Sequence, residues 1–167
     1  MELYFLRHAI AAEPGTVAVS YDAERPLTDE GIKKMEGSVK GMRRIGLSFD
    51  LIVSSPYLRA SETAEIVAGG LQYKGKIKFS EALTPNAEFK DLFKLIKEFK
   101  PESKTLLVGH LPSIGEFVAH LISGKNAVSM DYKKGGLCRV DMPKLITPSA
   151  LGQLVWFLTP KQLRAFI

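Results

Sequence analysis

Short apolar runs alternate with amphipathic stretches along the chain. Residues 3–6, 51–53 and 105–109 are largely apolar, as in the central strands of a sheet that is covered on both faces. Between them, apolar residues recur at helical spacing from Thr28 to Gly46 and again after Phe89. This alternation predicts an α/β fold with three α/β/α layers, in which helices cover both faces of a mostly parallel central sheet.

Residues near the ends of the segments refine this prediction. Thr28, followed by two acidic residues, is a typical helix start, and Thr159-Pro160 is another. Two later apolar runs, residues 137–142 and 151–158, are expected to add strands, at least one of them antiparallel at an edge. The length and the lack of a linker predict a single domain over residues 1–167.

Cationic and imidazole side chains follow three of the predicted strands. Arg7 and His8 end the first apolar run, Arg59 lies in the first turn of the helix after the second, and His110 ends the third. Arg25 closes the long loop that leaves the first strand. Ligands of open α/β sheets bind outside the carboxyl ends of the strands, so these five side chains are expected at one rim. Taken alone, the Arg-His pair fits a surface arginine next to a loop histidine as well as it fits a phosphate site.

Six segments also carry a resemblance to a known family: Leu6-Arg7-His8-Ala9, Arg25-Pro26-Leu27-Thr28 with Gly31, Val53-Ser54-Ser55-Pro56-Tyr57-Leu58-Arg59-Ala60 with Thr63, Leu83-Thr84-Pro85, Gly109-His110-Leu111-Pro112, and Trp156-Phe157-Leu158-Thr159-Pro160 with Leu163. In order and spacing they resemble the histidine phosphatase superfamily of phosphoglycerate mutase-like folds, and in particular its SixA-type phosphohistidine phosphatases. The resemblance covers nearly the whole chain. One departure is Ala9, which stands where the family signature has glycine.

The resemblance implies that His8 attacks phosphorus and carries the phosphoryl group as a covalent intermediate. His8 must then be neutral, so Arg7 and Arg59 are expected to disfavour its protonation, and a backbone carbonyl is expected to accept its other ring proton. Arg7, Arg59 and His110 are expected to bind the equatorial oxygens of the phosphoryl group, with Arg25 as a further contact. The resemblance also implies a metal-independent reaction without a cofactor.

Members of the superfamily that cleave phosphate esters commonly use a carboxylate in a Leu-x-Glu stretch to protonate the leaving oxygen. The corresponding segment here, residues 81–85, has proline in place of the acid. Phosphohistidine can carry a proton on its other ring nitrogen, so a missing acid favours a phosphoramidate substrate. Glu81, Glu88 and Asp91 remain alternative proton donors.

The lengths of two loops near the expected site bear on the class of substrate. Only a short loop joins Leu83 to the helix near Phe89, where other members carry insertions, so an open site suited to a protein surface is expected. The loop over residues 9–26 is expected to form a mobile flap. We therefore predict a phosphohistidine phosphatase that acts on a phosphohistidine-bearing protein, for example a phosphorelay domain. The alternatives are a phosphatase or mutase of small phosphate esters and a noncatalytic phosphate-binding module.

The amino-acid composition bears on the partners, metal sites and location of the protein. The net charge is +5, but the basic pairs, including Lys133-Lys134, are interpreted as solvated faces, and no basic run is interleaved with aromatic residues. A nucleic-acid partner is therefore not expected, whereas a positive field would help to collect an acidic phosphoprotein. With three histidines and one cysteine the chain has no zinc-ligand spacing, and Cys138 is expected to be a buried thiol. Because no signal peptide or membrane span is evident, a cytoplasmic location without membrane contact is predicted. The oligomeric state stays open.

Overall fold

The computed structural model describes residues 1–125, 128–147 and 149–166. These residues form a six-stranded sheet in the order β3-β2-β4-β1-β5-β6. The strands are β1 (Glu2–Arg7), β2 (Leu51–Ser54), β3 (Lys78–Phe79), β4 (Lys104–Gly109), β5 (Leu137–Asp141) and β6 (Gln153–Leu158). The helices are α1 (Asp29–Arg44), α2 (Leu58–Gly70), α3 (Phe89–Lys97), α4 (Ser113–Ser123) and α5 (Pro160–Arg164), with short 3-10 turns η1 (Asp22–Glu24) and η2 (Glu81–Leu83).

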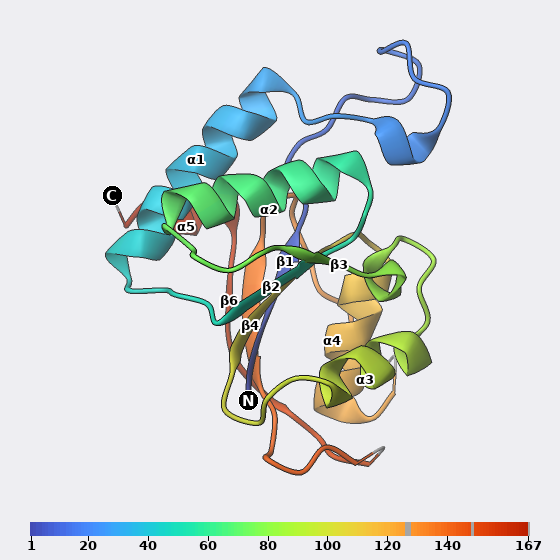
Figure 1. Ribbon diagram of the computed structural model, residues 1–167, viewed down its shortest axis with the longest axis vertical. Coiled ribbons are helices and arrows are strands. Elements are labelled where there is room, and N and C mark those ends of the chain that lie inside the picture. Colours follow the sequence, from blue (N-terminus) through green and yellow to red (C-terminus); the bar gives the residue numbers. More distant parts are fainter. Residues whose placement is uncertain (126–127, 148, 167) are drawn as a thin grey trace.

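Helices cover both faces of the sheet, as Figure 1 shows. Residues of α1, α2 and α5 pack against one face, and residues of α3 and α4 pack against the other. Strand β1 explains why its apolar run is continuous: Leu3 and Phe5 belong to one core, while Tyr4 and Leu6 belong to the opposite core. The predicted three-layer α/β/α fold is confirmed.

The strand directions match most of the prediction. Strands β1, β2, β3 and β4 pair in parallel, whereas β5 is antiparallel to both of its neighbours, and β6 forms the edge. The antiparallel pairing expected for the later runs is therefore present, with β5 one position inside the edge. The last strand is shorter than the predicted run over residues 151–158, since it begins at Gln153.

Two helix starts follow the predicted caps. The Thr28 side chain accepts a hydrogen bond from the Gly31 amide at 3.0 Å. The Thr159 side chain accepts from the Gln162 amide at 3.3 Å, directly before Pro160. These contacts satisfy amides at the first turns of α1 and α5, which have no partner within the helix.

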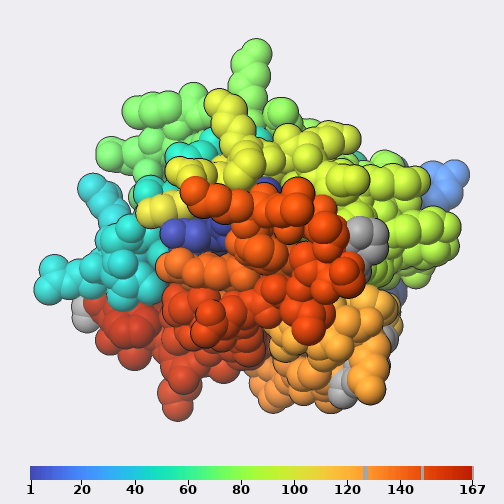
Figure 2. Space-filling view, turned by 90° about the horizontal axis from the view of Figure 1, so that it is seen from below, coloured from blue at the N-terminus to red at the C-terminus, as the bar shows by residue number. Residues whose placement is uncertain are grey.

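Parallel pairing brings the carboxyl ends of three strands together at the upper end of Figure 1. Arg7 of β1 lies opposite Gly109 of β4, and Ser54 of β2 lies opposite Val108. His8 and His110 therefore leave the sheet at adjacent points. At the opposite end, which Figure 2 shows, the blue amino terminus lies beside the orange-red segment after β5, and the Met1 amine donates to the Met142 carbonyl at 3.2 Å.

Candidate active site

His8 lies directly after β1 and is held on both sides by the backbone. Its amide donates to the Gly109 carbonyl at 3.0 Å, and its side chain is only 7% exposed. The ring Nδ1 lies 2.7 Å from the Ala9 carbonyl. Because a carbonyl can only accept, Nδ1 carries the proton and Nε2 presents its lone pair. The expected carbonyl acceptor is thus the one next along the chain.

Burial sets the protonation state of the two site histidines. The pKa of His8 is lowered to about 3, chiefly by burial; the Ala9 carbonyl opposes this shift, and the Arg59 and Arg7 guanidinium groups add to it. Burial likewise lowers the pKa of His110 to about 2, followed by the proximity of His8 and Arg59. Both rings are neutral at physiological pH. The arginines contribute as expected, but burial is the larger cause.

Ala9, directly after His8, fits its position without strain. Among the described non-glycine residues only Gln72 has a positive φ, so Ala9 lies outside the left-handed region in which glycine would be favoured. Its amide donates to the Thr63 hydroxyl at 3.0 Å, and its side chain is buried. The departure from the family glycine therefore leaves the local backbone intact.

Two glycines hold the segment around His8. Gly135, with φ of +80°, donates its amide to the carbonyls of Arg7 at 3.0 Å and His8 at 3.1 Å. On the other side, a Cβ on Gly31 would lie 2.0 Å from the Ile10 carbonyl oxygen, so only glycine allows α1 to approach so closely. Backbone contacts from two distant segments thus fix the loop that carries His8.

Side chains that follow β2 and β4 lie next to His8. The Arg59 side chain, in the first turn of α2, is 4% exposed, and its Nε donates toward His8 Nε2 at 3.4 Å. The rings of His8 and His110 lie 5.0 Å apart between centroids. His110 Nε2 lies 2.9 Å from the Ser55 hydroxyl, and Arg7 Nη1 donates to the Tyr132 carbonyl at 2.7 Å.

Two nitrogen atoms of this cluster are buried and have no partner among the described residues: Arg7 Nε and His110 Nδ1. The Ser55 hydroxyl can donate to His110 Nε2, which leaves the proton on Nδ1. Both atoms are then donors without an acceptor, which is costly inside a protein. An oxyanion bound next to His8 Nε2 would supply the missing acceptors.

Arg25 joins the cluster through a residue that the sequence interpretation did not single out. The Asp22 carboxylate accepts from Arg25 at 2.7 Å and from Arg59 Nη2 at 2.9 Å, while the Asp22 carbonyl accepts from Arg59 Nη1 at 2.7 Å. Arg25 Nη1 also donates to the Ala12 carbonyl at 2.6 Å. Asp22 lies three residues before Arg25, but its link to Arg59 is tertiary, so no sequence pattern distinguishes it from nearby Glu24.

The charges around Asp22 keep it ionised. Burial alone would raise the pKa of Asp22, but hydrogen bonds from Arg25 and Arg59 hold it below its ordinary value. In this structure the charge of Arg59 is therefore paired with a carboxylate of the chain itself.

Sequence comparison shows the family of the chain. Residues 3–85 match the profile of the histidine phosphatase superfamily (branch 1). The chain belongs to this superfamily. It is 29% identical over 165 residues to the phosphohistidine phosphatase SixA homolog of Haemophilus influenzae, covering 93% of this chain and 88% of that protein. It is 33% identical over 139 residues to an uncharacterised protein of Picosynechococcus sp., covering 82% of each chain.

A solved structure of this superfamily has the same fold. The structure of the protein histidine phosphatase SixA complexed with tungstate superposes with a TM-score of 0.83 and 24% sequence identity, covering 98% of this chain and 99% of the other. At this identity the likeness establishes the fold. Together with the profile match, it confirms the SixA-type, phosphoglycerate mutase-like architecture expected from the motifs.

The three carboxylates that the sequence left open as proton donors make no described hydrogen bond or ion pair with the cluster around His8. Glu88 is exposed and pairs with Lys90 at 2.8 Å, and Glu81 is exposed in η2. Asp91 lines a separate cavity. Among the described hydrogen bonds and ion pairs, the carboxylate that reaches the site arginines is Asp22.

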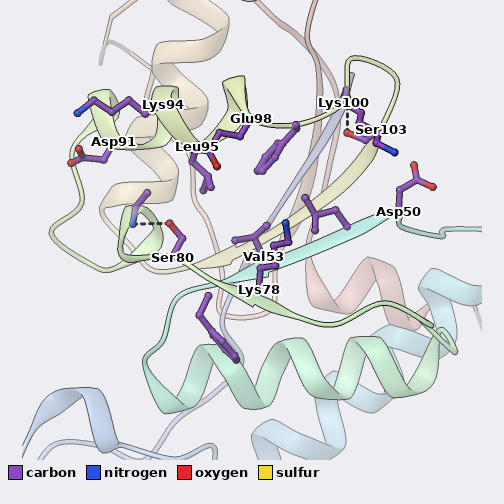
Figure 3. Close-up of a pocket in the computed structure, with 14 residues that line it drawn as sticks. Asp50, Val53, Lys78, Ser80, Asp91, Lys94, Leu95, Glu98, Lys100 and Ser103 are labelled. Atoms are coloured by element: carbon purple, nitrogen blue, oxygen red, sulfur yellow. Dashed lines mark hydrogen bonds between the residues drawn. The ribbon is translucent and has the colours of Figure 1, made fainter.

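The largest described cavity of this histidine phosphatase, about 610 Å³, lies away from His8 between β2, β3 and α3, as Figure 3 shows. Lysines and carboxylates alternate on its wall, among them Lys78, Lys94, Asp91 and Glu98. None of the five predicted site residues lines it. Cavity size therefore does not point to the cluster around His8.

The remaining sequence expectations concern single residues and partners. Cys138 is fully buried, and burial raises the pKa of its thiol to about 12, in agreement with the prediction of a buried thiol. In the described part of the chain, no three histidine, cysteine or acidic side chains gather so that they could hold a metal ion. No described helix combines the length and apolar character that crossing a membrane requires.

Proposed function

We propose that this histidine phosphatase hydrolyses phosphohistidine on a protein, through a covalent phosphohistidine intermediate at His8. The observation that carries this proposal is a neutral His8 whose Nε2 is unprotonated and faces a buried cluster of cationic and N–H donor groups. The similarity to the SixA homolog, at 29% identity, supports the substrate class.

In the first step the lone pair of His8 Nε2 attacks phosphorus, and the P–N bond to the substrate histidine breaks. The Ala9 carbonyl, bound to Nδ1–H, stabilises the ring as it becomes a phosphorylated imidazole. Arg59, Arg7 Nε and His110 Nδ1 donate to the three equatorial oxygens, on which negative charge is spread. Arg25 is a further contact at the open side.

In the second step a water molecule attacks phosphorus, the P–Nε2 bond breaks, and inorganic phosphate forms while His8 is restored. The same donors stabilise this second displacement, since its geometry mirrors the first. Splitting the hydrolysis into two transfers replaces one difficult step with two easier ones.

The leaving group favours a phosphoramidate over an ester. An ester oxygen leaves as a strong base and needs a proton donor, whereas a phosphohistidine ring can leave as neutral imidazole with its proton on the other nitrogen. Asp22, the carboxylate that contacts the arginines, is held in its ionised form and is a poor donor. These properties support phosphohistidine as the substrate.

The test measures phosphate release, without added metal, from a phosphohistidine protein, a phosphoserine peptide and a sugar phosphate. The wild-type protein is expected to hydrolyse the first substrate, and His8→Ala and His8→Asn are expected to abolish turnover while retaining the native circular dichroism spectrum. Normal turnover by both variants would refute the role of His8. Faster hydrolysis of the esters would instead favour a small-molecule phosphatase, and phosphate binding without turnover would favour a binding module.

A further inference from the structure

A second pocket opens beside the candidate active site, between α1, α5 and the loop before β5. Its volume is about 360 Å³. Its floor includes the apolar residues Ala9, Ile10, Met35 and Pro160. Five cationic side chains line it, and none of the described residues that line it is acidic: Lys34, Lys133, Lys134, Lys161 and Arg164. We call this set the basic pocket.

The basic pocket contains an unsatisfied donor. Three buried side-chain nitrogen or oxygen atoms lack a partner among the described residues: Arg7 Nε, His110 Nδ1 and Arg164 Nη1. The first two belong to the cluster around His8. Arg164 Nη1 is the third, and Arg164 lines the basic pocket, so a residue in the wall of this pocket also carries a buried N–H that lacks an acceptor.

The basic pocket is also continuous with the nucleophile segment. Ala9 and Ile10, which line it, directly follow His8. Gly135 lines it as well and donates its amide to the carbonyls of Arg7 and His8. A protein whose phosphorylated side chain reaches His8 therefore places its neighbouring residues close to this pocket.

The existing ion pairs at the rim are weak enough to be exchanged. Lys34 pairs with Glu30, Lys133 with Asp131 at 2.9 Å and Lys134 with Glu13 at 3.4 Å, and all three carboxylate side chains are more than half exposed. Exposed pairs of this kind contribute about 0–1 kcal/mol. Lys161 is exposed and has no ion pair among the described contacts. The rim can therefore accept carboxylates from outside at little cost.

We propose that the basic pocket is the docking surface for acidic side chains next to the phosphohistidine of the partner protein. This inference rests on the proposed function and adds the chemical character of the substrate surface. The cavity in Figure 3 differs, because carboxylates line it together with its lysines and none of the described residues that line it has a buried polar atom without a partner. Acidic side chains of a partner are thus expected to bind at the basic pocket and not in the cavity of Figure 3.

The test uses two peptides whose single histidine is phosphorylated chemically with phosphoramidate. In one peptide a run of glutamates flanks the histidine, and in the other the same positions are glutamine. The wild-type protein is expected to hydrolyse the acidic peptide with about tenfold higher kcat/KM, as a few exposed ion pairs allow. The preference is expected to fall as salt rises, since salt screens exposed charges.

The double variant Lys133→Glu/Lys161→Glu is expected to lose this preference and to hydrolyse the glutamine peptide like the wild type. A matched control is Lys94→Glu/Lys100→Glu, which makes the same change in net charge in the cavity of Figure 3 and is expected to keep the preference. Equal hydrolysis of both peptides by the wild type, or a preference that survives in the double variant, would overturn the docking role alone. Failure to hydrolyse either peptide would overturn the proposed function, and the docking role with it.

Discussion

We expect Asp22 to compete with the phosphoryl group for the arginines of the proposed site. Both terminal nitrogens of Arg59 donate to Asp22, one to its carbonyl at 2.7 Å and one to its carboxylate at 2.9 Å. Arg25 donates to the same carboxylate at 2.7 Å. An oxyanion that takes these donors must displace Asp22, so removing the carboxylate charge is expected to tighten oxyanion binding.

The size of the effect follows from the exposure of Asp22. Its side chain is 54% exposed, so solvent screens its ion pairs with Arg25 and Arg59. Pairs of this kind contribute about 0.2–1 kcal/mol each, and the two together about 0.4–2 kcal/mol. At about 1.4 kcal/mol per factor of ten, Asp22→Asn is expected to bind inorganic phosphate or tungstate about two- to thirtyfold more tightly.

Isothermal titration calorimetry with inorganic phosphate and tungstate measures this directly, and competitive inhibition of turnover gives an independent value. The matched control is Glu24→Gln, which removes the same charge from the same turn. Among the described contacts, the Glu24 carboxylate accepts only from the amides of Ser20 and Tyr21. Unchanged or weaker oxyanion binding by Asp22→Asn would refute competition. Weaker binding would mean that Asp22 orients the arginines for the oxyanion.

Three further predictions follow from the site. Arg59→Ala is expected to lower kcat by more than about 100-fold in steady-state assays, because it removes preorganised charge; a loss below tenfold would contradict its role. Gly31→Ala is expected to lower the thermal midpoint, since its Cβ would meet the Ile10 carbonyl at 2.0 Å; an unchanged midpoint would show that α1 can shift. Between about pH 6.5 and 3, His8 binds a proton in the unfolded state but not in the native state. As the pH is lowered through this range, the free energy of unfolding is therefore expected to decrease by up to about 1.4 kcal/mol per pH unit because of this residue. Denaturant unfolding of His8→Asn is expected to show a shallower pH dependence, and equal slopes would contradict the low pKa of His8.

The main fold features could be predicted because each follows from a local pattern. The run over residues 3–6 is apolar at every position since alternate residues of β1 enter two different cores. His8, Arg59 and His110 each follow a parallel strand, and parallel strands end at one edge of the sheet. In contrast, the two-residue strand β3 is too short to give a period-two pattern.

The features that escaped prediction depend on contacts between distant segments. Asp22 and Arg59 are 37 residues apart, and no spacing rule connects them. The pair Lys133-Lys134, interpreted as a solvated face, joins Arg164 of α5 in the basic pocket only because β6 returns the chain to the same edge. Sequence showed which residue types could bind an anion, but the fold determines which of them share a pocket.

The causes of the His8 pKa separate two roles that the sequence interpretation had joined. The arginines were expected both to keep His8 neutral and to bind the phosphoryl group, yet burial is the largest cause of its low pKa. Loss of Arg59 would therefore weaken charge stabilisation in the transition state while leaving His8 a neutral nucleophile. In the proposed mechanism, burial at the end of β1 keeps the His8 imidazole neutral for attack, so the arginines are free to bind the substrate. In the structure the Asp22 carboxylate pairs with Arg25 and Arg59, and because its side chain is 54% exposed, we expect an incoming phosphoryl group to displace it.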